Sequence, residues 1–588
     1  MCGICGVIRY DKNHVDRGLV EHMLPALESR GPDAFGVHTG AGFGFGHRRL
    51  SIIDLSENGH QPMIDDELKL SIVYNGEIYN FQTLRTELQQ QGYSFRSTSD
   101  TEVLLKAYHA WGDKFVTRLN GMFAFCIHDQ ERGRFLLGRD RLGIKPLYYA
   151  EHDGIFYFAS NTQALKAAGA IEPELSPEAL HYYLSFHAVV PAPHTIFKNV
   201  KKLAPGTLMS IADDGTKTTS AYWDVQFERT ETLTEEEWTE RVLDELRQSV
   251  KRRMISDVPV GALLSGGLDS SLIVAFMAEC NPASLHTYSI GFEDVGTEEG
   301  NEFYYSDIIA KEFGTEHKKI FIDSRRLLPH IEKAISAMAE PMVSHDAVAF
   351  YLLSEEVSKE TKVVLSGQGA DEVFAGYHWY PKVMNGHRDA VTEYREAFFD
   401  RTHEEIMDVL QAPYHGPDVS GRFVAEHFAA PGAAGPVDKA LRLDTRIMLI
   451  DDPVKRVDNM TMAWGLEARV PFLDYKLVEL AASIPPELKV ASGGKHILKK
   501  AAERVIPHEV IYRKKGYFPV PALKYLRGEY LDFAHDILSS EKAKQRNLFN
   551  PAHLDMLLAA PEENMTVLGG SKLWQLTVLE LWLQKMGC

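Results

Sequence analysis

The pattern of apolar residues changes near residues 205–235, and this change limits the possible folds more than any other feature of the sequence. Before it, short apolar runs such as 69–74 and 122–128 are separated by glycine, aspartate and proline, and helical patterns are few. Numerous short strands with a few helices predict an α+β sandwich. We therefore expect a first domain over residues 1–210.

After the change, predicted strands and helices alternate. The apolar runs 258–264, 284–290 and 362–365 predict strands, and helical patterns separate them. Strands joined through helices form parallel sheets, because parallel neighbours need a long crossover connection. We therefore expect an α/β parallel-sheet domain over residues 225–588.

Composition limits the class of protein. The 588 residues include 63 basic and 82 acidic side chains, a formal net charge of −19. A general nucleic-acid binder needs a basic face, so we expect no nucleic-acid partner. No apolar run approaches the ~20 residues of a membrane span, so we expect no membrane association. Five cysteines are too few for a disulfide framework and odd in number, which favours a reducing, cytoplasmic location.

Cys2 directly follows the initiator methionine. Removal of Met1 would leave a thiol beside a free α-amine, whose reference pKa is ~7.7–8.0, and these groups form a nucleophile and its general base. Two other interpretations stay open: an ordinary buried thiol, or a redox or zinc pair with Cys5. Zinc needs four ligands, and the sequence offers no second pair at suitable spacing.

Asn75 and Gly76 offer two donors to an oxyanion, a side-chain amide and an unhindered backbone N–H. An Asn-Gly pair between two strand-like runs is also a strong signal for a hairpin turn. Both interpretations can hold, because a turn can present its donors to a site. Taken singly, the polar groups Arg30–Asp33, Gly46–Leu50 and Ser99–Asp100 are typical of turns or solvated loops.

A glycine-rich turn within Leu264–Ser271 follows a predicted strand and precedes a helical pattern. Glycines let the backbone approach an anion, serine hydroxyls add donors, and a helix N-terminus favours negative charge. The string is not a Walker loop, which would need Gly-x-x-x-x-Gly-Lys, and a plain helix cap is the alternative. Ser366–Glu372 follows another strand, so we expect it at the carboxyl edge of the sheet, where α/β ligands bind.

The motifs of the first half resemble the N-terminal-nucleophile (Ntn) glutaminase domain of class II glutamine amidotransferases. They are Cys2–Ile4, Arg30–Asp33, His47–Leu50, Asn75–Glu77, Asp100, Leu119–Ala124 and Arg139–Tyr148. The resemblance implies that Cys2 attacks the glutamine side-chain amide and that Asn75 and Gly76 form the oxyanion hole. It also implies that Arg49 pairs with the glutamine α-carboxylate, while Glu77 and Asp100 hold its α-ammonium.

The second half resembles the ATP pyrophosphatases, which adenylate a substrate and release pyrophosphate. The stretches 264–271, 456–458, 467–474 and 494–499 carry this resemblance. The implied ATP-binding residues are Leu264, Ser265, Gly266, Gly267, Asp269, Ser270, Ser271, Ile290, Ser366 and Gly367. Asp269 and Asp371 would hold Mg²⁺. Lys495 would stabilise charge on the adenylate and pyrophosphate, with a solvated lysine as the alternative.

Together the halves resemble glutamine-hydrolysing asparagine synthetases. The resemblance implies that ATP adenylates an acceptor carboxylate and that ammonia released at Cys2 displaces AMP. The implied partners are small molecules, namely glutamine, ATP and the acceptor, and a homodimer stays open. A β-lactam synthetase-like enzyme would share the adenylating half but typically lacks the N-terminal cysteine. A non-catalytic protein would tolerate loss of Cys2 or Asp269, and both are present.

The chain departs from the family at the implied acceptor site, which comprises Gln368, Asp371 and Glu372. At the position of Gln368, asparagine synthetases usually have a glutamate that deprotonates ammonia. The amide of Gln368 cannot take this proton, because an amide has no useful basicity near neutral pH. With the stretches 374–380 and 516–521, Gln368 looks like a branch that amidates N-acetylglutaminylglutamine, an osmoprotectant dipeptide. We expect this dipeptide as the acceptor, with aspartate as the alternative.

Overall fold

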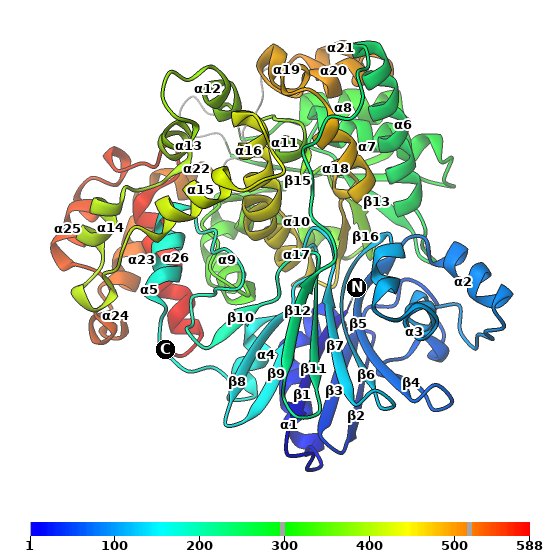
Figure 1. Ribbon diagram of the computed structural model, residues 1–588. Helices are drawn as coiled ribbons and strands as arrows, with labels where there is room; N and C mark the ends of the chain where they lie inside the picture. Colours follow the sequence, from blue (N-terminus) through cyan, green and yellow to red (C-terminus); the bar gives the residue numbers. More distant parts are fainter. Residues whose placement is uncertain (1, 294–299, 514–519) are drawn as a thin grey trace.

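The computed structural model describes residues 2–293, 300–513 and 520–588. These residues contain two antiparallel sheets in the first half and one parallel sheet in the second, as Figure 1 shows. The predicted fold class, an α+β sandwich joined to an α/β parallel-sheet domain, is confirmed.

The first half has four layers, with two stacked antiparallel sheets between helices. One sheet has the order β10-β8-β9-β1-β3-β2, and the other has the order β12-β11-β7-β6-β5-β4. The strands of the first sheet are β1 Gly3–Arg9, β2 Ala34–Gly40, β3 Phe43–Arg49, β8 Tyr148–His152, β9 Ile155–Ala159 and β10 Val200–Lys202. Those of the second are β4 Met63–Asp65, β5 Leu70–Ile78, β6 Gly121–Asp129, β7 Arg134–Arg139, β11 Thr207–Ala212 and β12 Lys217–Ala221. Apolar side chains of both sheets, such as Phe45 and Val73, share one core.

Helices cover the outer faces of this sandwich. Helix α1 (Arg17–Met23) packs on β1 and β3, and α2 (Phe81–Gln90) and α3 (Asp100–Trp111) pack on the second sheet. Helix α1 ends at Met23, where a 3₁₀ segment, Leu24–Arg30, begins with Pro25 in its first turn. Proline lacks the N–H that would continue the α-helical bonding.

The second antiparallel sheet extends past the predicted end of the first domain. Residue 210 lies inside β11, and β12 pairs with β11 as a further strand of the same sheet. The Asp213–Gly215 stretch, which resembles a linker in sequence, is the hairpin turn between these strands. The structural boundary therefore follows Ala221.

The parallel sheet of the second half has the order β15-β14-β13-β16-β17. Its strands are β13 Val260–Leu263, β14 His286–Phe292, β15 Glu316–Ile322, β16 Val363–Leu365 and β17 Glu467–Arg469. The strand order reverses between β13 and β16, and open α/β sheets bind ligands at the carboxyl edge of such a point. The motifs Leu264–Ser271 and Ser366–Glu372 directly follow these two strands.

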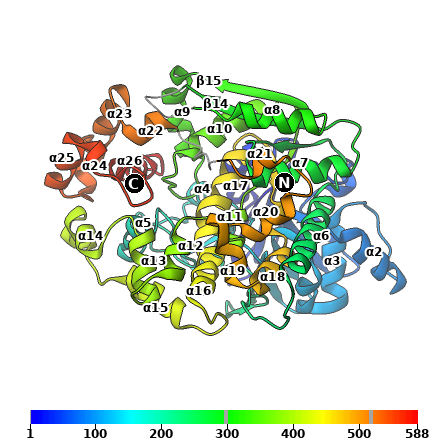
Figure 2. The same cartoon turned by 90° about the horizontal axis from the view of Figure 1, so that it is seen from above.

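Helices surround the parallel sheet and build a C-terminal group beside it. Those nearest the sheet include α6 Glu235–Arg253, α7 Leu268–Glu279, α8 Phe303–Glu312, α10 Asp346–Val357, α11 Ala370–Val373, α17 Lys455–Met462, α18 Tyr475–Ser483 and α20 His496–Ala502. The C-terminal group contains α23 Glu529–Leu538, α24 Glu541–Arg546, α25 Pro551–Ala559 and α26 Lys572–Lys585. Figure 2 shows this group at one side of the molecule, beside α14 (His403–Val409).

Within the described ranges, no helix combines the length and apolarity needed to cross a bilayer.

Buried ion pairs join the two halves. Asp458 on α17 accepts from Arg30 Nη1 (2.8 Å) and Lys145 Nζ (3.0 Å) of the first half. Burial alone would raise the pKa of Asp458, but the two cations outweigh it and lower the pKa to about 2. Lys202 of the first half likewise lies 2.8 Å from both Glu340 and Asp451. Buried charges are tolerated only when paired, so these contacts fix one half against the other.

Asp458→Asn should weaken this junction. It leaves Arg30 and Lys145 buried without their counter-charge, and such a loss costs ~3–5 kcal/mol. We expect a lower urea midpoint for unfolding. The control is Lys362→Gln. Lys362 pairs with Asp33 and so also joins the halves, but the Lys362 side chain is 40% exposed and the Asp33 side chain is 27% exposed. That loss should cost under ~1 kcal/mol. Equal midpoints for the two variants would contradict the assignment.

Candidate active sites

The first candidate site surrounds Cys2, which immediately precedes β1. Its backbone N–H donates to Asn75 Oδ1 (3.1 Å), and its carbonyl accepts from Arg30 Nε (3.3 Å). Cys2 is only 8% exposed, and burial raises the pKa of its thiol. The thiolate is the nucleophilic form, so this thiol needs an adjacent base to react at neutral pH.

Asn75 and Gly76 lie inside β5, so the prediction of a hairpin turn at this pair is wrong. They are paired with Ala124 and Phe123 of β6 within a nine-residue strand. A Cβ on Gly76 would overlap the carbonyl oxygen of Met122. Glycine is therefore required here by the close approach of the neighbouring strand.

One side-chain donor at this position has no partner. Asn75 Oδ1 accepts from Cys2, whereas the buried Nδ2 has no hydrogen-bond partner in the part of the chain that the structure describes. Leaving a buried donor unsatisfied costs ~1–3 kcal/mol, which a bound anion would recover. The unused amide therefore suits the oxyanion role predicted from the sequence.

A cavity lies beside Cys2, and it collects the residues predicted to bind glutamine, with Asn75 adjoining it. Its lining residues are Cys2, Arg49, Leu50, Ile52, Ile53, Gly59, Gln61, Tyr74, Gly76, Glu77, Ser99, Asp100 and Thr101. Sequence reasoning missed Gln61 and assigned no role to Tyr74. Gln61 Oε1 accepts from the Tyr74 N–H (2.7 Å), and the Tyr74 hydroxyl donates to Asp100 Oδ2 (2.8 Å). Tyr74 directly precedes Asn75, and this position could have indicated that Tyr74 belongs to the site. No local sequence pattern indicated that Gln61 belongs to it.

The charges in this cavity match an α-amino acid. The Arg49 guanidinium donates to the carbonyl oxygens of Asp54 and Ser56, which hold it in place. Glu77 and Asp100 are buried, and burial raises the pKa of both carboxyl groups. One guanidinium and two carboxyl groups can bind the α-carboxylate and α-ammonium of one ligand.

The second candidate site begins with the loop between β13 and α7. Ser265 Oγ lies 3.1 Å from Ser270 Oγ and accepts from the Gly267 N–H (3.3 Å). Gly267 is the N-cap of α7, a helix of 12 residues. Hydroxyls and backbone donors therefore gather at a helix N-terminus, which is a favourable position for phosphate.

Lys495 connects this loop to the loop after β16. Its Nζ lies 2.7 Å from Asp269 Oδ2 and 2.9 Å from Asp371 Oδ1. Burial lowers the pKa of Lys495, but the two carboxylates outweigh it and the net shift is upward, so the side chain is a cation at neutral pH. Lys495 is 7% exposed, and the alternative of a solvated lysine is wrong.

The remaining residues predicted for ATP lie in the loop after β16 and on β14, on either side of β13. A Cβ on Gly367 would lie 3.1 Å from the Ser270 backbone nitrogen, so the two loops are in close contact. Ser366 is buried next to it, and its N–H donates to the carbonyl of Arg469 (2.8 Å). Ile290 lies on β14. Its neighbour Ser289 donates a hydrogen bond from its hydroxyl to the Leu264 carbonyl, which connects β14 to the start of the glycine-rich loop.

Three charged residues in the stretches that carry the ATP pyrophosphatase resemblance lie at the junction of the halves. Asp458 binds Arg30 and Lys145, as described above, and Arg469 lies 3.5 Å from Glu77. Asp474 accepts from Arg253 Nη1 (2.9 Å) and lies 3.4 Å from Asn120 Nδ2 of the first half. Of the stretch 516–521, residues 516–519 lie outside the described residues.

The predicted acceptor residues lie at the start of α11. Gln368 is half-buried, and Glu372 is 1% exposed. Glu372 Oε1 accepts from the Tyr377 hydroxyl (2.5 Å), while its buried Oε2 has no hydrogen-bond partner within the described ranges. Burial, together with the neighbouring Asp371 carboxylate, raises the pKa of Glu372 to about 7.

Two aromatic residues of the stretch 374–380 stabilise the fold. Trp379 Nε1 (3.1 Å) and the Tyr380 hydroxyl (2.6 Å) donate to Asp444 Oδ2. Both rings are buried. These contacts explain their presence without a substrate, so they do not distinguish one acceptor from another.

Comparisons with known proteins match both halves. The model of the glutamine amidotransferase domain matches residues 1–223, and that of asparagine synthase matches residues 241–584. Asparagine synthetase [glutamine-hydrolysing] 1 of Bacillus subtilis (strain 168) is 34% identical, with 99% of this chain and 96% of the relative covered. Asparagine synthetase [glutamine-hydrolysing] 3 of the same strain is 33% identical, covering 95% and 93%. Asparagine synthetase B [glutamine-hydrolysing] of Escherichia coli (strain K12) is 30% identical, covering 88% and 82%.

Proposed function

The chain belongs to the asparagine synthetase family, and from this premise we propose how its two sites divide one reaction. The enzyme is a carbon–nitrogen ligase of the glutamine-hydrolysing type, and its family uses ATP. We assign glutamine hydrolysis to the Cys2 cavity and carboxylate activation to the edge of the parallel sheet. The observation that carries this assignment is the cavity itself, where Cys2 meets one guanidinium and two carboxyl groups.

In the first step, Cys2 attacks the side-chain amide of glutamine. Arg49 pairs with the α-carboxylate, and the α-ammonium lets Glu77 and Asp100 ionise by providing an opposite charge. The Asn75 amide and the Gly76 N–H bind the oxyanion that forms when Sγ adds to the amide carbon. With Met1 removed, the α-amine of Cys2 takes the thiol proton and delivers it to the departing ammonia, and water then cleaves the thioester to give glutamate and the free thiol.

In the second step, an acceptor carboxylate attacks the α-phosphorus of ATP and pyrophosphate leaves. Ser265, Ser270 and the N-terminus of α7 bind the phosphates, and Lys495 neutralises the charge on pyrophosphate. The carboxylates of Asp269 and Asp371 face one cationic group and provide only oxygen donors, so this pair fits Mg²⁺. When bound, Mg²⁺ would screen the phosphate charges from the attacking carboxylate.

In the third step, ammonia displaces AMP, and the new amide must lose a proton. Gln368 cannot accept this proton near neutral pH. We assign the role to Glu372, because one oxygen of its carboxyl has no hydrogen-bond partner among the described residues and its pKa is about 7. A group with this pKa combines a substantial ionised fraction with useful basicity.

We propose N-acetylglutaminylglutamine as the acceptor, with aspartate as the alternative. Gln368, in the position where the family usually has glutamate, supports the dipeptide. The three relatives compared above are named asparagine synthetases, and their names favour aspartate. Both acceptors present a carboxylate for adenylation, so the assigned chemistry is the same for either.

Cys2→Ala should separate the two sites. Loss of the nucleophile should lower glutamine-dependent amide synthesis by at least ~10³-fold. Synthesis from added ammonium chloride should stay within about twofold, because the second site keeps its residues. Cys280→Ala, which removes an exposed thiol, is the control and should change neither rate. An equal fall in both activities would contradict separate sites.

The acceptor can be identified by pyrophosphate release. We expect release with ATP, glutamine and N-acetylglutaminylglutamine, and little with aspartate in its place. Turnover with aspartate alone would reject the dipeptide and leave the two-site chemistry intact. Gln368→Glu is the companion variant, and it should not produce an efficient asparagine synthetase if the dipeptide assignment holds.

Ammonia-dependent synthesis should depend on the ionisation of Glu372. At constant free NH₃, the rate should rise from pH 6 to 8 with a midpoint of about 7, because the carboxylate is the active form. Glu372→Gln should remove this rise and lower the rate ~10²–10⁴-fold while pyrophosphate exchange persists. Tyr377→Phe removes a hydrogen bond that lowers the Glu372 pKa, so it should move the midpoint upward. A normal pH profile in Glu372→Gln would overturn the role.

A further inference from the structure

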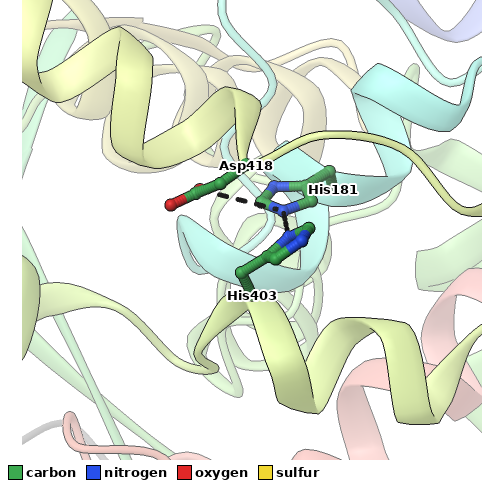
Figure 3. A group of neighbouring side chains, drawn as sticks. All are labelled: His181, His403 and Asp418. Carbon is green, nitrogen blue, oxygen red and sulfur yellow. Dashed lines mark hydrogen bonds and ion pairs between the residues drawn. The ribbon is translucent and has the colours of Figure 1, made fainter.

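A group of metal-binding side chains lies at the junction of the halves, outside both candidate active sites. His181 belongs to α5 (Pro177–Ser185), His403 begins α14, and Asp418 is the N-cap of α15 (Val419–Ala429). One possible ligand atom from each residue lies within 4.8 Å of the others. Figure 3 shows His403 and Asp418 next to the His181 ring, each linked to it by a dashed line. A helix of the first half therefore meets two neighbouring segments of the second half at this point.

The distances among these atoms approach those around a zinc ion. His181 Nε2 lies 3.0 Å from His403 Nδ1 and 3.9 Å from Asp418 Oδ1. Tetrahedral ligands at ~2.0–2.2 Å from Zn²⁺ are separated by ~3.3–3.5 Å. Changes of about 0.5 Å in these two distances would match tetrahedral ligands, and the ligand atoms of His403 and Asp418 lie within 4.8 Å of each other. Water would be the fourth ligand.

The surroundings orient two of the ligands. His181 Nδ1 lies 2.7 Å from Ser420 Oγ, and its other ring nitrogen, Nε2, faces His403 and Asp418. In metal sites, a histidine ligand commonly forms a hydrogen bond through the ring nitrogen that does not bind the metal. The ring is buried, so the packing around it restricts its orientation.

Asp418 is held from two sides. Its Oδ2 accepts from Arg395 Nη2 (2.8 Å), and its Oδ1 accepts from the Gly421 N–H (2.8 Å). A carboxylate oxygen has two lone pairs, so Oδ1 retains one for a metal. The positive charge of Arg395 disfavours a nearby cation. Its guanidinium, however, donates to Oδ2 of Asp418, and the metal would bind Oδ1.

We propose that His181, His403 and Asp418 bind one Zn²⁺ or chemically similar transition-metal ion that fastens the end of the first half to the second. Two imidazoles and one carboxylate suit such an ion better than Mg²⁺ or Ca²⁺, which prefer oxygen ligands alone. The three residues are distinct from every residue assigned to glutamine, ATP or the acceptor, so the ion is structural. A hydrogen-bonded histidine pair without metal is the competing explanation.

The full-length, tag-free protein tests this proposal. After treatment with EDTA and return to Zn²⁺, we expect one zinc per chain by mass spectrometry of the metal content after gel filtration. We also expect a thermal midpoint that Zn²⁺ raises and Mg²⁺ does not. Less than stoichiometric zinc, or an equal effect of Mg²⁺, would overturn the proposal in favour of the metal-free pair.

Matched variants identify the ligands. Asp418→Asn keeps an N-cap for α15 but removes the carboxylate, and His403→Gln keeps a polar group near His181. Each should weaken zinc binding at least ~10-fold. His415→Gln is the control, because His415 is bonded to the Leu410 carbonyl (2.9 Å) and lies outside the cluster. Unchanged zinc affinity in Asp418→Asn and His403→Gln would show that other residues hold the metal.

Discussion

The pairing of buried charges between the halves is the constraint on which both active sites depend. Asp458 of the second half binds Arg30, and Arg30 in turn donates to the carbonyl of Cys2. A carboxylate of the adenylating half therefore fixes the residue that carries the thiol. Arg469 makes a similar link, because it lies on β17 of the parallel sheet and faces Glu77 in the glutamine cavity. Separating the halves would leave these charges buried and unpaired, so their relative position is energetically fixed. A fixed relation suits an enzyme in which one site supplies ammonia to the other.

Strand order explains the position of the second site. The chain reverses direction across the sheet between β13 and β16, and their carboxyl ends present two loops side by side. Lys495 closes this arrangement by bridging a carboxylate from each loop. Its backbone has φ 55°, in the left-handed region, which costs ~1–2 kcal/mol for a residue with a Cβ. Strain of this kind persists where surrounding contacts fix the conformation, and the two ion pairs are such contacts.

Local patterns predicted the elements well, whereas contacts between distant segments were outside their reach. The loop Leu264–Ser271 was predictable because strand, glycine turn and helix follow one another directly. Asn75-Gly76 misled because a dipeptide signal for a turn competes with pairing to β6, whose partners are about 50 residues away in sequence. The stretch 456–458 was associated with the ATP pyrophosphatase resemblance, and nothing local in it shows that Asp458 faces Arg30 and Lys145 of the other half. The gathering of Cys2, Arg49, Glu77 and Asp100 was expected through resemblance, since no periodicity brings these positions together.

The contrast between Gln368 and Glu372 shows that environment, as well as residue type, determines which group can move a proton. The pKa of Glu372 rises through burial and through the charge of Asp371, while Lys495 opposes the rise. Lys495 also binds Asp371 and Asp269, so its position affects Glu372 electrostatically. Because Lys495 lowers the Glu372 pKa, any loss of its contact with Asp371 would leave the Asp371 charge less offset and would favour the protonated form of Glu372.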